Sequence, residues 1–255
     1  MQRSNFRSTF ISLLNARSYQ APYYRLGQSG RFVVLLAGMI LGFSATGQTL
    51  LDLSVGTSSQ DNFNVQVAVR QQFSDRLQVG LELQAGSPQY RFVGAQVMRE
   101  GYSYAASVPL AFRLAKEKKI QLYGIGRLGA RFQGIIDPDE NDMRDSILAS
   151  TAIIGELGLA SGFRVGEKIT LQAGLSFPLA YEVSPNALFE YTWTKLHFGG
   201  SWNSPRTSVF LHSNVGSALG ASGDTYKYIW SLEVGVRYTL GNAQNEPFQF
   251  IQTSF

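Results

Sequence analysis

The two histidines are the residues of this chain with the clearest capacity for chemistry. His197 and His212 lie in two segments of alternating polarity, on either side of Ser204-Pro205. If those two residues form a two-residue hairpin loop, Asn203 pairs with Arg206. His197 then faces His212 on the polar side of both strands, and paired imidazoles could bind a metal ion or change charge with pH. A metal site normally needs a third ligand, which the sequence does not place, so we expect hydrogen-bonded side chains and no metal. The same register pairs Leu211 with Phe198 and Val209 with Gly200.

An acidic segment, 137–145, begins like a calcium-binding loop. Asp137, Asp139 and Asn141 place oxygen ligands at alternate positions. The glycine that such a loop needs at its sixth position is Asp142, and the bidentate Glu at its twelfth is Leu148. We therefore expect a solvated external loop without calcium.

Catalytic motifs are absent from the sequence. It has no Cys, no Gly-x-Ser-x-Gly, no His-Glu-x-x-His and no phosphate loop. His212 and Ser213 are neighbours on one strand, so their side chains point to opposite faces and cannot form a dyad. The remaining combination that could form a catalytic dyad is His197 with Ser208 or Ser201. We expect neither an enzyme nor a cofactor.

The positive charge of the chain belongs to its amino terminus. Of 22 Lys and Arg and 18 Asp and Glu, residues 1–47 hold five Arg and no acid, which leaves 17 basic against 18 acidic residues. A nucleic-acid partner is therefore excluded, because such binding needs a basic surface.

Residues 1–47 are typical of a secretory signal peptide. Arg31 is followed by an uncharged apolar run over 32–43 and then by the small residues Ala45 and Gly47. This pattern predicts cleavage before Gln48. The run is shorter than the ~20 residues of a spanning helix, although an uncleaved membrane anchor remains an alternative.

The elements that position these residues are strands. After Gln48 the dominant hydrophobic period is two; in 62–70, for example, Phe63, Val65 and Val67 alternate with Asn64 and Gln66. Ten such segments cover 49–56, 62–70, 77–86, 102–114, 119–132, 149–165, 168–181, 189–203, 206–216 and 227–240.

The connections between these segments alternate in length. Short turns are predicted at 74–76, 116–118, 166–168 and 204–205, and longer polar loops at 57–62, 86–101, 133–148, 182–188 and 217–226. An up-and-down barrel in an outer membrane has short turns on one side, longer loops on the other and an even strand number.

Aromatic residues on the apolar parity gather at both strand ends, with aliphatic residues between them. Two aromatic belts around an aliphatic band indicate lipid interfaces, whereas a soluble sandwich or lipocalin-like barrel has no reason to sort aromatics in this way. Near the short turns lie Phe73, Phe112, Phe163, Trp202 and Tyr238, and near the long loops Phe63, Tyr102, Tyr104, Phe132, Tyr181, Tyr226 and Tyr228.

On these patterns, residues 49–240 resemble the small, porin-like outer-membrane β-barrels of Gram-negative bacteria. The segment 230–240 resembles the final strand of such barrels. The resemblance implies an all-β, transmembrane, up-and-down antiparallel barrel of about ten strands (eight to twelve) over 48–240, placed in the cell outer membrane. It also implies contact with outer-membrane lipid and with the barrel-assembly machinery during biogenesis. The tail 241–255 departs from the pattern, because the terminal aromatic Phe255 lies beyond the last strand; the tail could instead add a short strand.

The polar parity of such a barrel would line its lumen, where charges must be paired or hydrated. The predicted lining is Arg70, Glu82, Arg113, Arg127, Arg131, Glu156, Arg164, Lys195, His197, His212, Glu233 and Arg237, with Glu182, Tyr123, Gln66, Gln78, Gln84 and Gln172 between them.

Three functions follow from this lining. The first is a structural or surface-interaction barrel with a lumen plugged by Arg–Glu pairs, whose external loops could meet a protein partner. The second is a narrow solute or ion channel that prefers anions, because the six lumen Arg outnumber the four Glu. The third and most distant is a barrel enzyme acting on lipid. A wide porin is excluded, because it needs ~16–18 strands.

Overall fold

The computed structural model describes residues 48–59, 61–91, 98–135, 149–184, 188–219, 226–240 and Phe248. The predicted signal peptide (1–47) and the calcium-like segment 137–148 lie outside the described residues. The described residues form ten strands: β1 (Gln48–Ser58), β2 (Asp61–Gln72), β3 (Leu77–Arg91), β4 (Met98–Lys116), β5 (Ile120–Ile135), β6 (Ala149–Val165), β7 (Ile169–Ser184), β8 (Leu188–Asn203), β9 (Thr207–Leu219) and β10 (Tyr226–Leu240).

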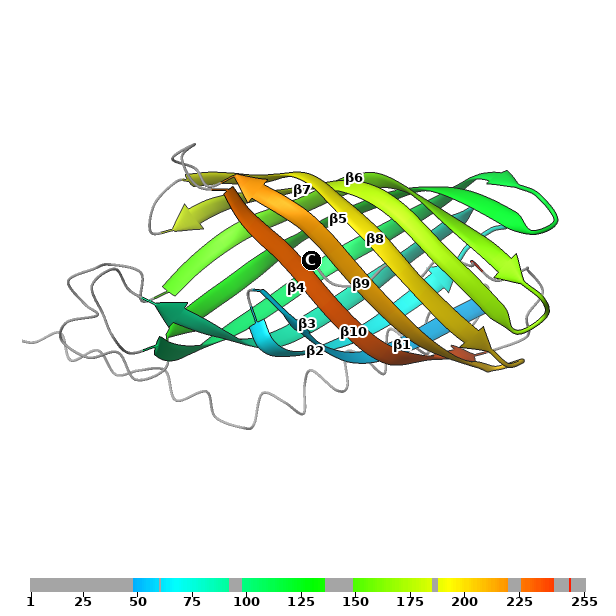
Figure 1. The fold of residues 1–255 in the computed structure, drawn as a ribbon, viewed down its shortest axis with the longest axis horizontal. Helices are drawn as coiled ribbons and strands as arrows, with labels where there is room; N and C mark the ends of the chain where they lie inside the picture. The colour runs from blue at the N-terminus through cyan, green and yellow to red at the C-terminus, as the bar shows by residue number, and fades with distance from the viewer. Residues whose placement is uncertain are drawn as a thin grey trace, which may run out of the picture. The chain divides into compact units, whose positions relative to one another are not determined.

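The strands close into one antiparallel barrel (Figure 1). Each strand pairs with its neighbours in sequence, and β1 completes the ring by pairing with β10, from Thr49 opposite Leu240 to Ser58 opposite Ser231. Closure leaves no strand edge exposed, which matters because an unpaired backbone group in hydrocarbon costs several kcal/mol. The predicted up-and-down topology and the strand number of ten are confirmed.

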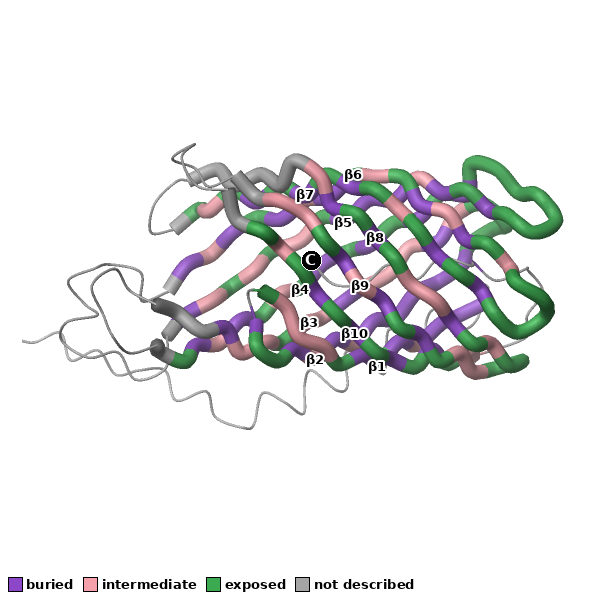
Figure 2. The backbone as a smooth tube through the Cα atoms, viewed as in Figure 1, coloured by how far each residue is buried: buried purple, intermediate pink, exposed green. Residues whose placement is uncertain are grey.

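The barrel is apolar outside and polar inside. Along the strands, exposed and buried positions alternate (Figure 2). Leu157 is 70% exposed and Leu128 65%, whereas inward neighbours such as Glu156 and Arg127 are buried. A soluble protein would not expose so continuous an apolar surface. The fold is therefore a transmembrane β-barrel, and the soluble sandwich is excluded. Within the described residues, no helix combines the length and the apolar character needed to cross a membrane.

The predicted aromatic residues lie toward both ends of the outer surface, and the residues between them are mostly aliphatic, with the exposed Phe177 at the middle of β7 as an exception. At the end that carries the short turns (the turn end), all five predicted aromatics are exposed on the outer surface, with Trp202 at 59%. At the opposite end (the loop end), Phe63, Tyr104, Phe132, Tyr181 and Tyr228 are exposed, and Tyr102 is half-buried. The Tyr226 side chain lies outside the described residues.

Two of the connections predicted to be long are short. Only residues 59–60 join β1 to β2, and only 185–187 join β7 to β8, where the sequence predicted loops at 57–62 and 182–188. The 86–101 loop is also overestimated, because β3 and β4 pair as far as Arg91 opposite Met98. Strand ends that project beyond the hydrocarbon keep their ladder hydrogen bonds without needing an alternating pattern. Polar sequence therefore does not mark where such a strand ends.

The predicted register of the β8–β9 hairpin is wrong. The Ser204 amide donates to Thr207 O at 2.8 Å, so the two loop residues are Pro205 and Arg206 instead of Ser204 and Pro205. Proline is favoured at the first central position of such a turn because its φ is already near the required value. The pairing therefore moves by two residues. The observed pairs are Asn203–Ser208, Trp202–Val209, Gly200–Leu211, Gly199–His212, Phe198–Ser213 and His197–Asn214.

Two glycines make room for the largest inward side chains of β9. Gly235 pairs with Phe210, and Gly199 pairs with His212. A Cβ atom on Gly235 would lie 2.4 Å from Phe210 Cζ, and one on Gly199 would lie 2.8 Å from His212 Cδ2. Each ring therefore lies flat over the neighbouring strand inside a narrow lumen.

Candidate functional site

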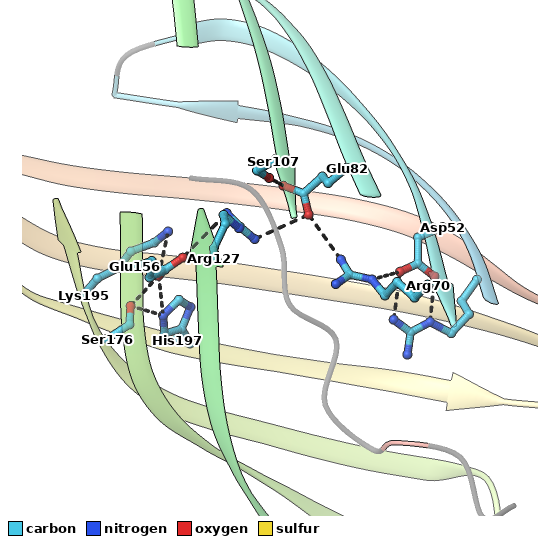
Figure 3. A network of polar contacts seen from close by, with 10 residues as sticks. Asp52, Arg70, Glu82, Ser107, Arg127, Glu156, Ser176, Lys195 and His197 are labelled. Atoms are coloured by element: carbon cyan, nitrogen blue, oxygen red, sulfur yellow. Dashed lines mark hydrogen bonds and ion pairs between the residues drawn. The ribbon is translucent and has the colours of Figure 1, made fainter. Parts of the chain in front are cut away.

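A chain of alternating charges runs around the inside of the barrel (Figure 3). We call it the ion-pair belt. Every residue of the belt lies on the inward parity of its strand and is buried. The period of two points these side chains, from distant parts of the sequence, into the lumen, where neighbouring strands bring them together. Its members are Asp52, Arg70, Glu82, Arg127, Glu156, Lys195 and Arg237.

The belt crosses the seam where the first and last strands meet. Arg237 on β10 donates to both carboxylate oxygens of Asp52 on β1, at 2.6 and 2.8 Å. Arg70 on β2 donates from Nε to Asp52 Oδ2 at 2.8 Å. Asp52 therefore links three adjacent strands, with an arginine on each side.

Arg127 joins the two halves of the belt. Its Nη2 donates to Glu82 Oε2 at 3.4 Å, and its Nη1 lies 3.6 Å from Glu156 Oε2. Glu82 also accepts from Arg70 Nη2 at 3.3 Å and from the Ser107 hydroxyl at 3.5 Å. Each carboxylate thus lies between cations, and one guanidinium spans from β3 to β6.

Glu156 ends the belt in a cluster with β7 and β8. Its Oε1 accepts from the Ser176 hydroxyl at 2.5 Å and lies 3.7 Å from Lys195 Nζ. His197 Nε2 lies 2.6 Å from Ser176 Oγ and 3.5 Å from the same carboxylate oxygen. This is not the geometry of a catalytic triad, in which the carboxylate binds the ring nitrogen opposite the one that faces the serine. His197 thus contacts Ser176, and neither Ser201 nor Ser208 pairs with it in the sheet register.

The two histidines are diagonal neighbours and do not form a directly opposed pair. Their ring centroids lie 5.7 Å apart with a tilt of 39°. The corrected hairpin register is the reason, because it moves each ring two residues from the predicted partner. Across the described part of the chain, no three His, Asp or Glu side chains are arranged to hold a metal ion.

The structure places the predicted lumen residues on the inward parity of their strands. Arg131, Arg164 and Glu182 are half-buried, as is Gln84. The fully buried members are Arg70, Glu82, Arg113, Arg127, Glu156, Lys195, His197, His212, Glu233 and Arg237, with Tyr123, Gln66, Gln78 and Gln172.

Sequence reasoning missed two members of the site. Asp52 is the only charged residue of the segment 49–56, and a carboxylate in an apolar barrel strand must face inward, so the signal was present. Ser176 carried no signal, because its role depends on where β6 and β8 place Glu156 and His197. Adding Asp52 and the buried Asp61 brings the carboxylates of the described lumen close to the cations in number. The excess of arginine over acidic residues in the lumen is therefore smaller than the sequence predicted.

Above the belt, at the loop end, the lumen opens into a polar pocket. It lies between β5, β6 and β7, where the small Ala152 pairs with both Arg131 and Glu182. The pocket is lined by Arg131, Gln133, Ser150, Ala152, Ala180 and Glu182.

Comparison with known proteins returned structures but no sequence relatives. No family model and no curated protein matches the chain. Among solved structures, the translocator domain of the autotransporter NalP from Neisseria meningitidis shares 14% identity over 83% of this chain and 95% of its own, with a TM-score of 0.47. The NanC porin shares 12% identity over 74% of this chain and 100% of its own, with a TM-score of 0.39. The Neisserial surface protein A shares 12% sequence identity over 75% of this chain and 95% of its own, with a TM-score of 0.35.

Those likenesses are too low to bear on function, so the assignment rests on the chain itself. Its closed antiparallel ring, its apolar exterior between two aromatic belts and its enclosed charges are features of one architecture. The chain has the architecture of the small outer-membrane β-barrels.

Proposed function

We propose that this protein is a non-enzymatic barrel of the outer membrane, with a closed lumen, that acts as a structural or surface-interaction scaffold. The ion-pair belt is the observation that carries the proposal. Its charges are buried and joined to one another across the lumen by hydrogen bonds and ion pairs, from the β10–β1 seam to β8. In a ring of ten strands the interior is barely wider than the side chains that fill it.

A permeating ion would have to break this network. Removing one partner of a buried ion pair costs about 3–5 kcal/mol, because the other charge stays desolvated. The belt contacts also connect strands around the ring: they hold β10, β1, β2 and β3 together and link β5 to both β3 and β6. The belt is therefore better suited to rigidity than to conduction.

The exterior supports residence in a lipid bilayer. The exposed leucines at mid-strand would contact acyl chains, and the belts at both ends would lie at headgroup level. The proposed partners are outer-membrane lipid, the assembly machinery during biogenesis and a protein that meets the loop end. In this proposal the signal peptide directs export and is removed before Gln48.

Placement and orientation are tested with epitope tags on intact cells. A tag inserted in segment 136–148, the longest connection between described strands, should bind antibody without permeabilisation. A matched tag between Glu117 and Lys118, at the turn end, should bind only after the outer membrane is opened. Equal labelling of both tags on intact cells, or of neither, would contradict this placement.

The closed lumen is tested by conductance of the refolded full chain in planar bilayers. Insertion is checked first, because a folded barrel migrates differently on gels before and after boiling. We expect a heat-modifiable band and no stepwise current. Discrete openings of the wild-type protein would overturn the closed lumen.

The loop-end pocket favours one second candidate, a narrow channel. The pocket leaves room for water between Arg131 and Glu182 on the side away from the turns. If the wild-type protein conducts, Arg127→Ala or Arg131→Ala should weaken its anion preference. Unchanged selectivity in both variants would contradict the assignment of Arg127 and Arg131 to the conducting lumen.

A further inference from the structure

We propose that the turn end of the lumen contains a binding site for an aromatic side chain. Its occupant is Phe248, from the chain's own C-terminal segment. This contact fills the lumen on the turn-end side of Arg127 and Glu156, and it involves no residue of the belt. The proposal goes beyond the scaffold function, because it assigns a role to the tail that follows the last strand.

The first observation is the burial of Phe248 itself. It lies eight residues beyond the end of β10 at Leu240, yet it is only 4% exposed. Its ring stacks on that of Tyr123, with centroids 5.2 Å apart and planes inclined by 27°. The guanidinium carbon of Arg113 lies 4.6 Å from the Phe248 ring centroid, within the range of a cation–π contact.

The second observation is the wall against which Phe248 packs. Ala111, Ile125 and Ala160 form a buried apolar cluster with Tyr123 and Phe248. The strand register makes this wall continuous, because Ala111 pairs with Ile125 and Tyr123 pairs with Ala160. Most of the buried lumen residues are polar, so an apolar patch on β4, β5 and β6 would be unfavourable if it faced water.

The wall also has the shape that an aromatic ring needs. Two of its members are alanines, which leave space above the sheet for a large side chain. The Tyr123 hydroxyl donates to the Gln121 side chain, which holds the phenol ring in place. Arg113 and Tyr123 pair across β4 and β5, so the cation and the ring meet the same occupant.

The segment between Leu240 and Phe248 is long enough for Phe248 to reach this site. Arg113 and Tyr123 lie three residues from the β4 and β5 ends that meet at the 117–119 turn, the same end of the barrel at which β10 finishes. Eight residues at ~3.3–3.6 Å each reach across the mouth of a small barrel. Arg127 of the belt lies four residues further along β5 than Tyr123, so the aromatic site lies nearer the turn end than this part of the belt.

The test uses the fact that the native sequence contains no cysteine. Ala160→Cys places a thiol in the aromatic site, and Ala180→Cys places a control thiol in the loop-end pocket. Each is made in the full chain and in a chain that ends at Leu240. A charged, water-soluble thiol reagent is applied to the folded barrel in detergent. Folding of all four proteins is checked by heat modifiability.

We expect truncation to speed labelling at position 160 at least tenfold and to leave position 180 unchanged. Phe248→Ala in the full chain should speed labelling at position 160 as well, which covers the case in which the truncated chain fails to fold. Equal labelling at position 160 with and without Phe248 would overturn the proposal.

A peptide of residues 241–255 gives a second readout. Added to the truncated Ala160→Cys barrel, it should restore slow labelling, whereas the same peptide with Phe248→Ala should not. Equal protection by both peptides would show that the site does not recognise the aromatic ring. Conductance separates this proposal from the scaffold function: the truncated chain should stay silent, because the belt remains in place. Current through the full-length wild type would refute the closed belt, while the labelling result would still decide the aromatic site.

Discussion

Arg237 and Asp52 lie 185 residues apart and form a two-point ion pair across the seam that closes the barrel. The two residues are also direct partners in the β1–β10 ladder. Parallel hydrogen bonds from one guanidinium to one carboxylate fix both distance and orientation. The last strand is therefore matched to the first by a buried side-chain contact as well as by backbone pairing.

Loss of this contact should destabilise the barrel. Asp52→Asn keeps the volume of the side chain but leaves Arg237 and Arg70 without their shared anion, at an expected cost of about 3–5 kcal/mol. Unfolding in denaturant from lipid vesicles, followed by tryptophan fluorescence, measures the change. Asp75→Asn, on the exposed 73–76 turn, is the matched control and should change little. Equal stabilities of the two variants would contradict a structural role for the seam pair.

The Glu156 cluster should behave as a coupled unit. Glu156→Gln leaves Lys195 facing the guanidinium of Arg127 with less negative charge nearby, so the unfolding free energy should fall. Adding Lys195→Met to this variant removes the uncompensated cation and should recover part of the loss. A double-mutant cycle should give a coupling energy of roughly 0.5–3 kcal/mol. Strictly additive changes would show that the two groups do not interact.

The corrected hairpin register can be checked by cross-linking. Trp202 and Val209 are direct partners on the outer surface, so Trp202→Cys with Val209→Cys should form a disulfide under mild oxidation. Gly200→Cys with Val209→Cys tests the alternative register, in which those two residues would be opposite. We expect no cross-link in that pair, because partners two residues out of register have Cα atoms about 7–8 Å apart. The reverse result would restore the register inferred from sequence.

A charged residue on the outer surface should lower the free energy of unfolding more when it lies deeper in the bilayer. Leu157 lies at the middle of β6 and is 70% exposed, so Leu157→Arg should cost about 2–4 kcal/mol in a bilayer. Val165→Arg, at the end of β6 beside the turn, should cost about 0–1 kcal/mol. The same vesicle unfolding measurement compares them. Equal costs would indicate that Leu157 does not face the hydrocarbon core.

Alternation of residue types was enough to predict which side chains point into the barrel. Because a strand has a period of two, one correctly placed polar residue fixes the face of every other residue in that strand. Glu82, Arg127 and Glu156 were placed in this way, and each is buried. The same rule applied to Asp52 would have placed its carboxylate in the lumen.

Pairing between strands was less accessible from sequence. Moving the β8–β9 turn by one residue keeps every side chain on its face, so the hydrophobic pattern cannot distinguish the two registers. The hydrogen bond from the Ser204 amide to Thr207 O and the β8–β9 ladder show which turn forms. Loop lengths were overestimated for a related reason, since strand ends outside the hydrocarbon carry no alternating signal.

The sequence by itself determined that this is a barrel with a polar interior and an apolar exterior, because burial in lipid constrains every second residue of each strand. The tertiary structure decided which enclosed charges meet, how the two histidines lie and where Phe248 packs. Those contacts join residues far apart in the chain, and they depend on the register of neighbouring strands and on the closure of β1 against β10. Neither of these leaves a mark on the local pattern of residue types.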